Sequence, residues 1–208
     1  LYVSVKDMGI LCEKAIEKAA KTILSNDKNE DNYVALVKEV DNYEKEVDRK
    51  EREVENMCMR LLLHQQPVAT DLRTVSSALK LISDMERIGD QASDITELSK
   101  YIRNCSLHHK LHLSEMFSET IGLVKKAVDS FSNHDLDKAK EAIEGDDKID
   151  GLFNKVKSEL VAIIKDDTDA ELCIDLLMVA KYLERIGDHA VNIAEWVVYS
   201  IEGVHKDI

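Results

Sequence analysis

This sequence contains an internal repeat, which limits the folds that are open to it. The five residues Glu86 to Asp90, ERIGD in one-letter code, recur unchanged as Glu184 to Asp188, 98 residues later. Further identical residues follow each copy at the same spacing, among them Ala92 and Ala190. A repeat of this length predicts a duplicated structural unit rather than a single motif. Each copy also places a glutamate and an aspartate four residues apart, so both carboxylates share one face of a helix.

The composition of the chain favours helices. The 208 residues include one proline and seven glycines, too few for the many turns of an all-β protein. Alanine, leucine, lysine and glutamate, which are good helix formers, are abundant. No stretch approaches the roughly 18 consecutive apolar residues of a membrane span. The formal net charge of −13 argues against direct nucleic-acid binding, which needs basic surfaces that neutralise phosphates.

Two features bear on the compartment in which the protein works. The first residues of the chain do not have the pattern of a signal peptide. The four cysteines, Cys12, Cys58, Cys105 and Cys173, are widely scattered and form no CxxC pair. We therefore expect reduced cysteines in a cytoplasmic protein.

Apolar residues recur with helical spacing along six segments of the chain. We expect helices over residues 3–25, 31–64, 67–102, 113–131, 135–165 and 169–201. Pro67 is placed to open the third helix, because proline suits a first helical turn, and Thr168 is placed to cap the sixth. The polar segment 104–109 separates two sets of three helices, so we expect one unit over 1–105 and another over 106–208. The sequence thus predicts an all-α protein of two tandem three-helix bundles related by internal duplication.

The partners of the first repeated acids follow from the lengths of the helices. We expect the second and third helices to form an antiparallel hairpin that turns near Gln66. Residues equally far from the turn lie at the same height, since every residue advances a helix by about 1.5 Å. Glu86 then faces Asp48, and Asp90 faces Glu44. These four carboxylates form the first expected cluster.

The fifth and sixth helices repeat this arrangement around a turn near Asp167. Glu184 then faces Asp150, and Asp188 faces Asp146. Counting back from the turn therefore leads, in each hairpin, to two acidic residues that stand four positions apart. We predict two equivalent clusters of four carboxylates each.

Crowded carboxylates disfavour their own ionisation unless cations neutralise them. Oxygen ligands suit Mg²⁺, Ca²⁺, Mn²⁺ and iron, and they argue against a dedicated structural zinc site. We expect the clusters to bind divalent or trivalent metal ions, and the choice among iron, manganese, magnesium and zinc stays open. The alternative is a purely structural duplication, in which the acids are solvated or bound by arginine and lysine.

Helical bundles also build oxidative di-iron enzymes, which place a histidine three residues after a ligating glutamate. The corresponding positions here are Gly89 and Gly187. The sequence contains no GxGxxG or Walker loop and no recognisable serine–histidine–aspartate arrangement. We therefore expect no catalytic residues. The alternative is a metal-dependent helical-bundle enzyme that uses the same carboxylates.

Several separated motifs resemble the PhoU family of phosphate transport accessory proteins. The segment 65–73, QQPVATDLR, is similar to the family's QP-x-A-x-DLR pattern and precedes the first ERIGD. The segment 183–195 resembles the second signature of the family, and the segment 199–203 resembles its ending. The second half has lysine and glutamate where the repeat spacing would place Pro67 and Arg73 again. A role of this arginine therefore does not carry over to the second half.

The resemblance implies a non-enzymatic cytoplasmic regulator that restrains phosphate uptake and the phosphate-starvation response. Such proteins are held to couple the ATPase subunit of the phosphate ABC transporter to a sensor histidine kinase. They meet the membrane only through these partners and are often homodimers. The family's multinuclear metal sites fall here on Glu44, Asp48, Glu86, Asp90, Asp146, Asp150, Glu184 and Asp188. Because the sequence has no phosphate-cradling loop, we expect the chain to read the transporter through protein contacts.

Overall fold

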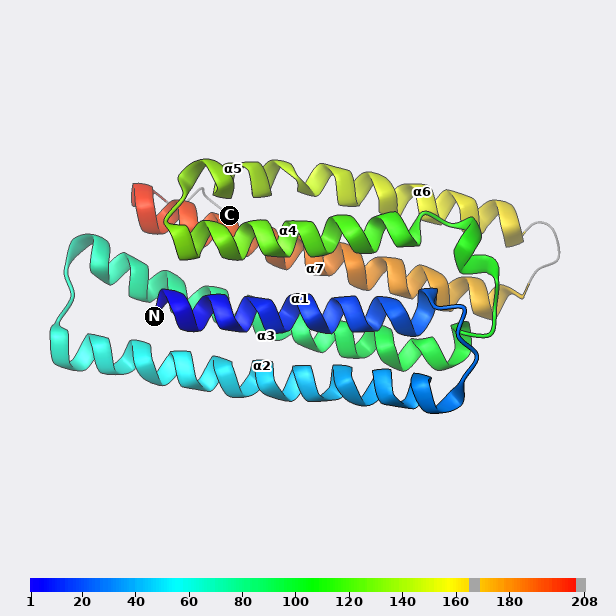
Figure 1. Ribbon diagram of the computed structural model, residues 1–208. Coiled ribbons are helices and arrows are strands. Elements are labelled where there is room, and N and C mark those ends of the chain that lie inside the picture. Colours follow the sequence, from blue (N-terminus) through cyan, green and yellow to red (C-terminus); the bar gives the residue numbers. More distant parts are fainter. Residues whose placement is uncertain (165–168, 205–208) are drawn as a thin grey trace.

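The protein is an elongated bundle of helices (Figure 1). The structure, a computed structural model, describes residues 1–164 and 169–204, and it contains no strand within them. The helices are α1 (Tyr2–Leu24), α2 (Glu30–Gln65), α3 (Ala69–Ile102), the short 3-10 helix η1 (Leu107–Lys110), α4 (Leu113–Asn133), α5 (Leu136–Glu144), α6 (Asp146–Ile164) and α7 (Ala170–Glu202). The all-α prediction is confirmed.

The two sets of helices lie side by side, with α3 and α7 antiparallel at the centre (Figure 1). α2 packs on the outer side of α3, and α6 packs on the outer side of α7. α1 and α4 form a second layer that covers one side of the central pair. No helix of the described chain covers the opposite side. We call that side, formed by α2, α3, α7 and α6, the open face.

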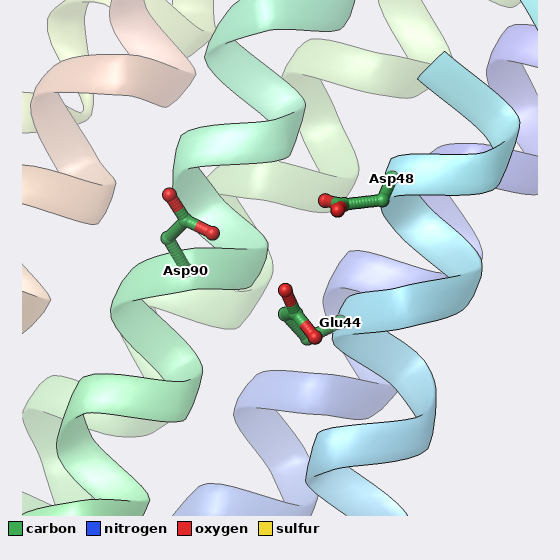
Figure 2. A group of neighbouring side chains, drawn as sticks. All are labelled: Glu44, Asp48 and Asp90. Carbon is green, nitrogen blue, oxygen red and sulfur yellow. The ribbon is translucent and has the colours of Figure 1, made fainter. Parts of the chain in front are cut away.

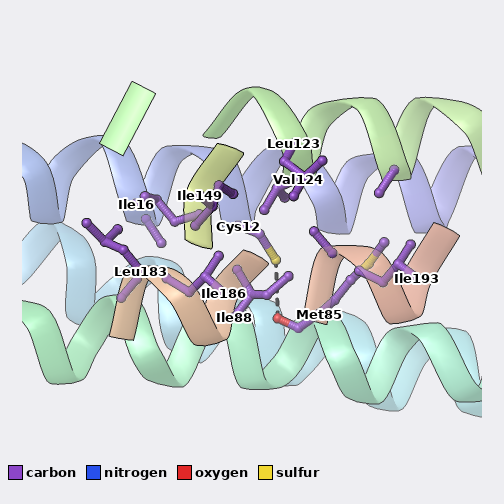
Figure 3. Packing of buried hydrophobic residues seen from close by; sticks show 14 of the residues in the cluster. Cys12, Ile16, Met85, Ile88, Leu123, Val124, Ile149, Leu183, Ile186 and Ile193 are labelled. Atoms are coloured by element: carbon purple, nitrogen blue, oxygen red, sulfur yellow. Dashed lines mark hydrogen bonds between the residues drawn. The ribbon is translucent and has the colours of Figure 1, made fainter. Parts of the chain in front are cut away.

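Buried apolar side chains of both halves form one continuous core. Figure 3 shows Cys12 and Met85 of the first half packed close to Ile186 of the second, and all three are fully buried. The Cys12 thiol also donates a hydrogen bond to the main-chain oxygen of Met85, at 3.3 Å. The expected boundary between 1–105 and 106–208 falls between α3 and η1. The division into two domains stays a prediction, because the core continues across it.

The prediction of one helix over 135–165 is wrong, because the segment forms two helices. α5 ends at its C-cap residue Gly145, whose N–H still donates to two main-chain oxygens in the last turn of that helix. A side chain at Gly145 would come within 2.9 Å of Leu123, so the glycine lets α4 approach closely. α6 then starts at Asp146, where a carboxylate is favoured by the positive end of the helix dipole.

Two predicted helix starts also differ from the structure. Pro67 lies in the turn before α3, and the helix begins at Ala69, because Val68 is extended with φ −126° and ψ 158°. The side chain of Asp169 caps α7 by accepting hydrogen bonds from two N–H groups of the first turn. Thr168, the predicted cap, lies outside the described residues.

The contact between α3 and α7 contains two related pairs of residues. In the second pair, each residue is replaced by its repeat equivalent on the other helix. Asp84 of α3 accepts a hydrogen bond from Asn192 of α7, at 3.2 Å. The residues at the repeat spacing from these two, Tyr182 of α7 and Asp94 of α3, also lie close together: burial, followed by the charge of Asp94, raises the pKa of Tyr182. The repeat therefore relates α3 to α7 by an approximate twofold axis. This axis passes between the helices at the level of the glycine in each ERIGD segment.

A side chain of the first half also closes the last turn of α7. Gly203, at φ +76°, ends this helix in the left-handed region that favours glycine. The Nε of Arg73 donates to the main-chain oxygen of Ser200 at 3.5 Å, and a side chain at Gly203 would come within 3.2 Å of the guanidinium. A positive charge is favourable at the C-terminal end of a helix. Arg73 therefore ties α3 to the end of α7.

Candidate metal sites

Each ERIGD segment anchors its helix with its middle residues and presents carboxylates with its outer ones. Ile88 and Ile186 are fully buried in the core. A side chain at Gly89 would meet Val47 of α2 at 3.3 Å, and one at Gly187 would meet a carboxylate oxygen of α6 at the same distance. The two glycines therefore let α2 approach α3 and let α6 approach α7. This approach brings acids from two helices together at each place.

The first cluster lies between α2 and α3, with α1 passing behind it (Figure 2). Glu44, Asp48 and Asp90 each offer a carboxylate oxygen, and these three atoms lie within 4.8 Å of one another. Burial, followed by the charges of Asp48 and Asp90, raises the pKa of Glu44. Burial, followed by the charge of Asp48, raises the pKa of Asp90. The three predicted residues therefore form a site that favours a neutralising cation.

Glu86, the fourth predicted member, stands one turn before Asp90 and is not among the three closest acids. It is half-buried, and burial raises its pKa together with the charges of Asp90, Glu51 and Asp48. The hairpin count did not include Glu51, which lies three residues after Asp48 and accepts a hydrogen bond from Ser83 at 3.4 Å. Its place on the same face of α2 is the signal that could have found it. The first cluster is thus larger than predicted.

The second cluster lies between α6 and α7. Burial, followed by the charges of Asp150, Asp188 and Glu184, raises the pKa of Asp146 to about 6. All four predicted acids are therefore close enough to act on one another. One oxygen of Asp146 is buried without a hydrogen-bond partner in the part of the chain that the structure describes. Such an orphaned carboxylate oxygen, surrounded by acids, suits a role as a cation ligand.

The two clusters are not equivalent, because each contacts a different basic side chain. In the first, Arg52 stands one turn after Asp48, and its Nη2 lies 3.5 Å from an oxygen of that carboxylate. Lys181 forms an ion pair with Glu184, whose side chain is 15% exposed. The residue at the repeat spacing before Lys181 is Ser83, which carries no charge. A lysine three residues before a glutamate shares its helix face, so the pairing was readable from the sequence. Among residues 1–164 and 169–204, only the first cluster brings three ligand oxygens within 4.8 Å.

The donors of both clusters are carboxylate oxygens, which hard cations prefer. The three closest acids of the first cluster supply no sulfur or imidazole, the usual ligands of structural zinc. His189, beside Asp188, lies toward α3, where its Nδ1 is 2.8 Å from Asp84. The arrangement therefore fits magnesium, manganese, calcium or iron better than structural zinc. That these acids bind a metal, and which one, stays a prediction.

Comparison with known sequences connects this geometry to a family. The family described as PhoU domain matches the chain twice, over residues 5–99 and 113–197. A phosphate-specific transport system accessory protein PhoU homolog of Clostridium acetobutylicum is 32% identical, and the alignment covers 100% of this chain and 94% of that protein. A homolog of the same name from Pseudomonas aeruginosa is 31% identical, with 94% of this chain and 80% of that protein covered.

Solved structures agree with the sequence matches. The crystal structure of PhoU from Pseudomonas aeruginosa has a TM-score of 0.84 at 29% identity, covering 97% of this chain and 95% of that one. The crystal structure of the phosphate transport system regulatory protein PhoU from Streptococcus pneumoniae has a TM-score of 0.86 at 26% identity, covering 99% and 95%. These likenesses confirm the fold of tandem bundles. None of the described helices is long and apolar enough to cross a membrane. With two copies of the family domain and relatives that align along its whole length, the chain belongs to the PhoU family.

Proposed function

We propose that this chain is a cytoplasmic accessory regulator of phosphate-specific transport. The observation that carries the proposal is its alignment, along nearly the whole chain, with proteins named phosphate-specific transport system accessory proteins. A solved relative named a phosphate transport system regulatory protein supports the same role. Both family domains and both ERIGD segments lie within the alignment with the Clostridium acetobutylicum homolog, which covers the whole chain.

The chain acts as an adaptor between the ATPase subunit of the phosphate ABC transporter and a sensor histidine kinase. It restrains uptake when phosphate is plentiful, meets the membrane only through these partners, and works as a homodimer. The names of its relatives support an association with the transporter. The formal net charge of −13 and the acids of the open face suit basic protein surfaces as partners.

The two clusters bind divalent or trivalent cations, and their occupancy shapes the open face for docking. In the first cluster Glu44, Asp48 and Asp90 are the ligands, and their three close oxygens support this role. In the second cluster the orphaned oxygen of Asp146 gives the support. When bound, a cation supplies the positive charge that relieves repulsion between the carboxylates. The acids themselves then hold α2 against α3 and α6 against α7.

The role needs no catalysis, and relatives named accessory or regulatory proteins support that view. The alternative is a metal-dependent hydrolase or redox enzyme that uses the same carboxylates. Such an enzyme would also need a general base and an open coordination position. Turnover of a phosphoester or of peroxide by metal-loaded protein, abolished by Glu184→Ala, would favour the alternative.

Affinity purification from phosphate-replete cells tests the adaptor role. We expect the transporter ATPase subunit or the sensor kinase to co-purify with the tagged wild type, and less of it with Asp90→Ala/Asp188→Ala. The matched control is Asp31→Ala/Asp137→Ala, which removes two exposed acids from first helical turns outside the clusters. If the control loses the partners equally, net charge and not the clusters governs the contact. If neither partner accompanies the wild type, the adaptor role is wrong.

A further inference from the structure

The open face carries a second repeated pattern, outside the acidic clusters. A large apolar or aromatic side chain stands eleven residues after each of four aspartates, Asp48, Asp90, Asp150 and Asp188. These side chains are Met59, Tyr101, Val161 and Tyr199. Eleven residues make about three helical turns, or about 16 Å, so each side chain shares a helix face with its aspartate. The first three are 46%, 61% and 48% exposed, and the fourth is half-buried, edge-on against Trp196.

Because neighbouring helices run antiparallel, these side chains fall at the two ends of the open face. In Figure 1, α2 and α7 end at the left of the view, and α3 and α6 end at the right. Met59 and Tyr199 lie in the last two turns of α2 and α7, and Tyr101 and Val161 lie in the last turns of α3 and α6. Each end therefore takes one residue from each half of the chain. More exposed apolar side chains of these four helices widen both ends: Leu63 and Leu72 at the first, Ile164 and Ile174 at the second.

The middle of the open face is acidic and polar. The two clusters flank the contact between α3 and α7, where Asp84 meets His189 and Asn192. The approximate twofold axis passes through this middle and exchanges the two ends. Tyr101 and Tyr199 each lie twelve residues, about 18 Å, along their helices from the level of the axis. Each half of the face therefore runs from acidic residues near the axis to an apolar or aromatic side chain about 18 Å away, so the whole pattern extends over about 36 Å. At one end the Nζ of Lys100 lies over the ring of Tyr101, 4.7 Å from its centre.

This pattern selects among possible occupants. A second copy of this chain would bring acidic clusters against acidic clusters, and like charges opposed across an interface are costly. A partner without symmetry would engage one end and leave the other apolar end in water. A pair of identical subunits related by a twofold axis presents the same surface twice, as this face does.

We infer that the open face docks a twofold-symmetric pair of identical partner subunits. These subunits carry basic side chains near their common axis and apolar side chains about 18 Å to either side of it. The inference rests on the proposed function, in which the phosphate transporter is the partner. Each end of the face binds one subunit. Once one end is bound, the other end is held close to its own subunit, and this high local concentration strengthens the overall binding.

Substitutions at one end test the contribution of that end. Tyr101→Ala/Val161→Ala should weaken binding to the purified, detergent-solubilised transporter by about tenfold or more, because truncated anchors cost this much at interfaces. Met59→Ala/Leu63→Ala, at the other end, should weaken it by a similar factor. Val3→Ala is the control, since Val3 is 73% exposed on α1, away from the open face. Loss at one end only, or an equal loss with the control, would overturn the inference.

Photo-crosslinking to the same transporter tests the symmetry. A photoreactive residue is placed at position 59 or at position 161, which the repeat makes equivalent. We expect both positions to cross-link to the same segment of one kind of subunit, and a chain carrying both to join two subunits. Cross-links to different segments would overturn symmetric docking and leave the regulatory role intact. If the wild type does not bind the transporter, both the docking and the proposed function are wrong.

Discussion

Removing the charge of Asp146 should stabilise the metal-free protein at neutral and alkaline pH. The pKa of this carboxyl is raised from 3.8 to about 6, first by burial and then by Asp150, Asp188 and Glu184. The folded chain therefore holds the proton more tightly than the unfolded chain does. The stability gained from protonation is complete below pH 3.8 and is lost as the pH rises through about 6. Asp146→Asn keeps the size of the protonated group and carries no charge at any of these pH values.

The size of the effect follows from the pKa shift. A shift of about two units corresponds to about 3 kcal/mol, at about 1.36 kcal/mol per unit. Asp146 is partly open to water, which screens its interactions, so we expect about 1–1.5 kcal/mol in the free energy of unfolding. For a chain of this length the melting temperature would rise by roughly 2–6 °C.

Thermal unfolding in the presence of a chelator measures this difference. We expect Asp146→Asn to be more stable than the wild type at pH 8 and nearly equal to it at pH 4. Asp147→Asn is the control, because it removes an exposed carboxylate from the same helical turn. Equal stabilisation by both substitutions, or a gain at pH 8 that persists unchanged at pH 4, would show that the charge of Asp146 does not destabilise the folded chain. Millimolar magnesium should reduce the stability difference between Asp146→Asn and the wild type at pH 8, since a cation stabilises the charged cluster of the wild type.

Three further substitutions test contacts elsewhere. Arg73→Ala should lower the free energy of unfolding by about 1–2 kcal/mol, because it removes the charge that closes α7, and an unchanged urea midpoint would contradict this. Gly9→Ala should cost about 2–3 kcal/mol in the same assay, since the new methyl would come within 2.4 Å of Val128, a stiff and buried side chain. Lys181→Ala should tighten magnesium or manganese binding at the second cluster by freeing Glu184, and calorimetric titration would show no change if their ion pair is unimportant.

Regular helix geometry explains why the positions of the acids were predictable from the sequence. Every residue of a helix adds the same rise, so one count from the turn placed Asp90 level with Glu44. The structure brings these two residues together with Asp48. Glu86 stands one turn before Asp90 along α3 and lies outside that closest group. The role of all these acids as metal ligands stays a prediction.

Features that depend on contacts between distant segments could not be predicted in this way. The break falls at Gly145, where a side chain would come within 2.9 Å of Leu123 of α4. The contact of Arg73 with α7 joins residues 127 positions apart and has no local signal. The approximate twofold axis between α3 and α7 is also invisible in helix periodicity. The axis becomes apparent only in the structure. There Asp84 contacts Asn192, the residue at the repeat spacing from Asp94, and Asp94 lies near Tyr182, the residue at the repeat spacing from Asp84.

The role proposed for this chain is to restrain phosphate uptake. The most direct measurement is the initial rate of radiolabelled phosphate uptake in phosphate-replete cells, with and without the chain. Removal of the chain should raise the rate, and re-expression of the wild type should bring it back down. An uptake rate that does not change when the chain is removed would contradict the proposed role.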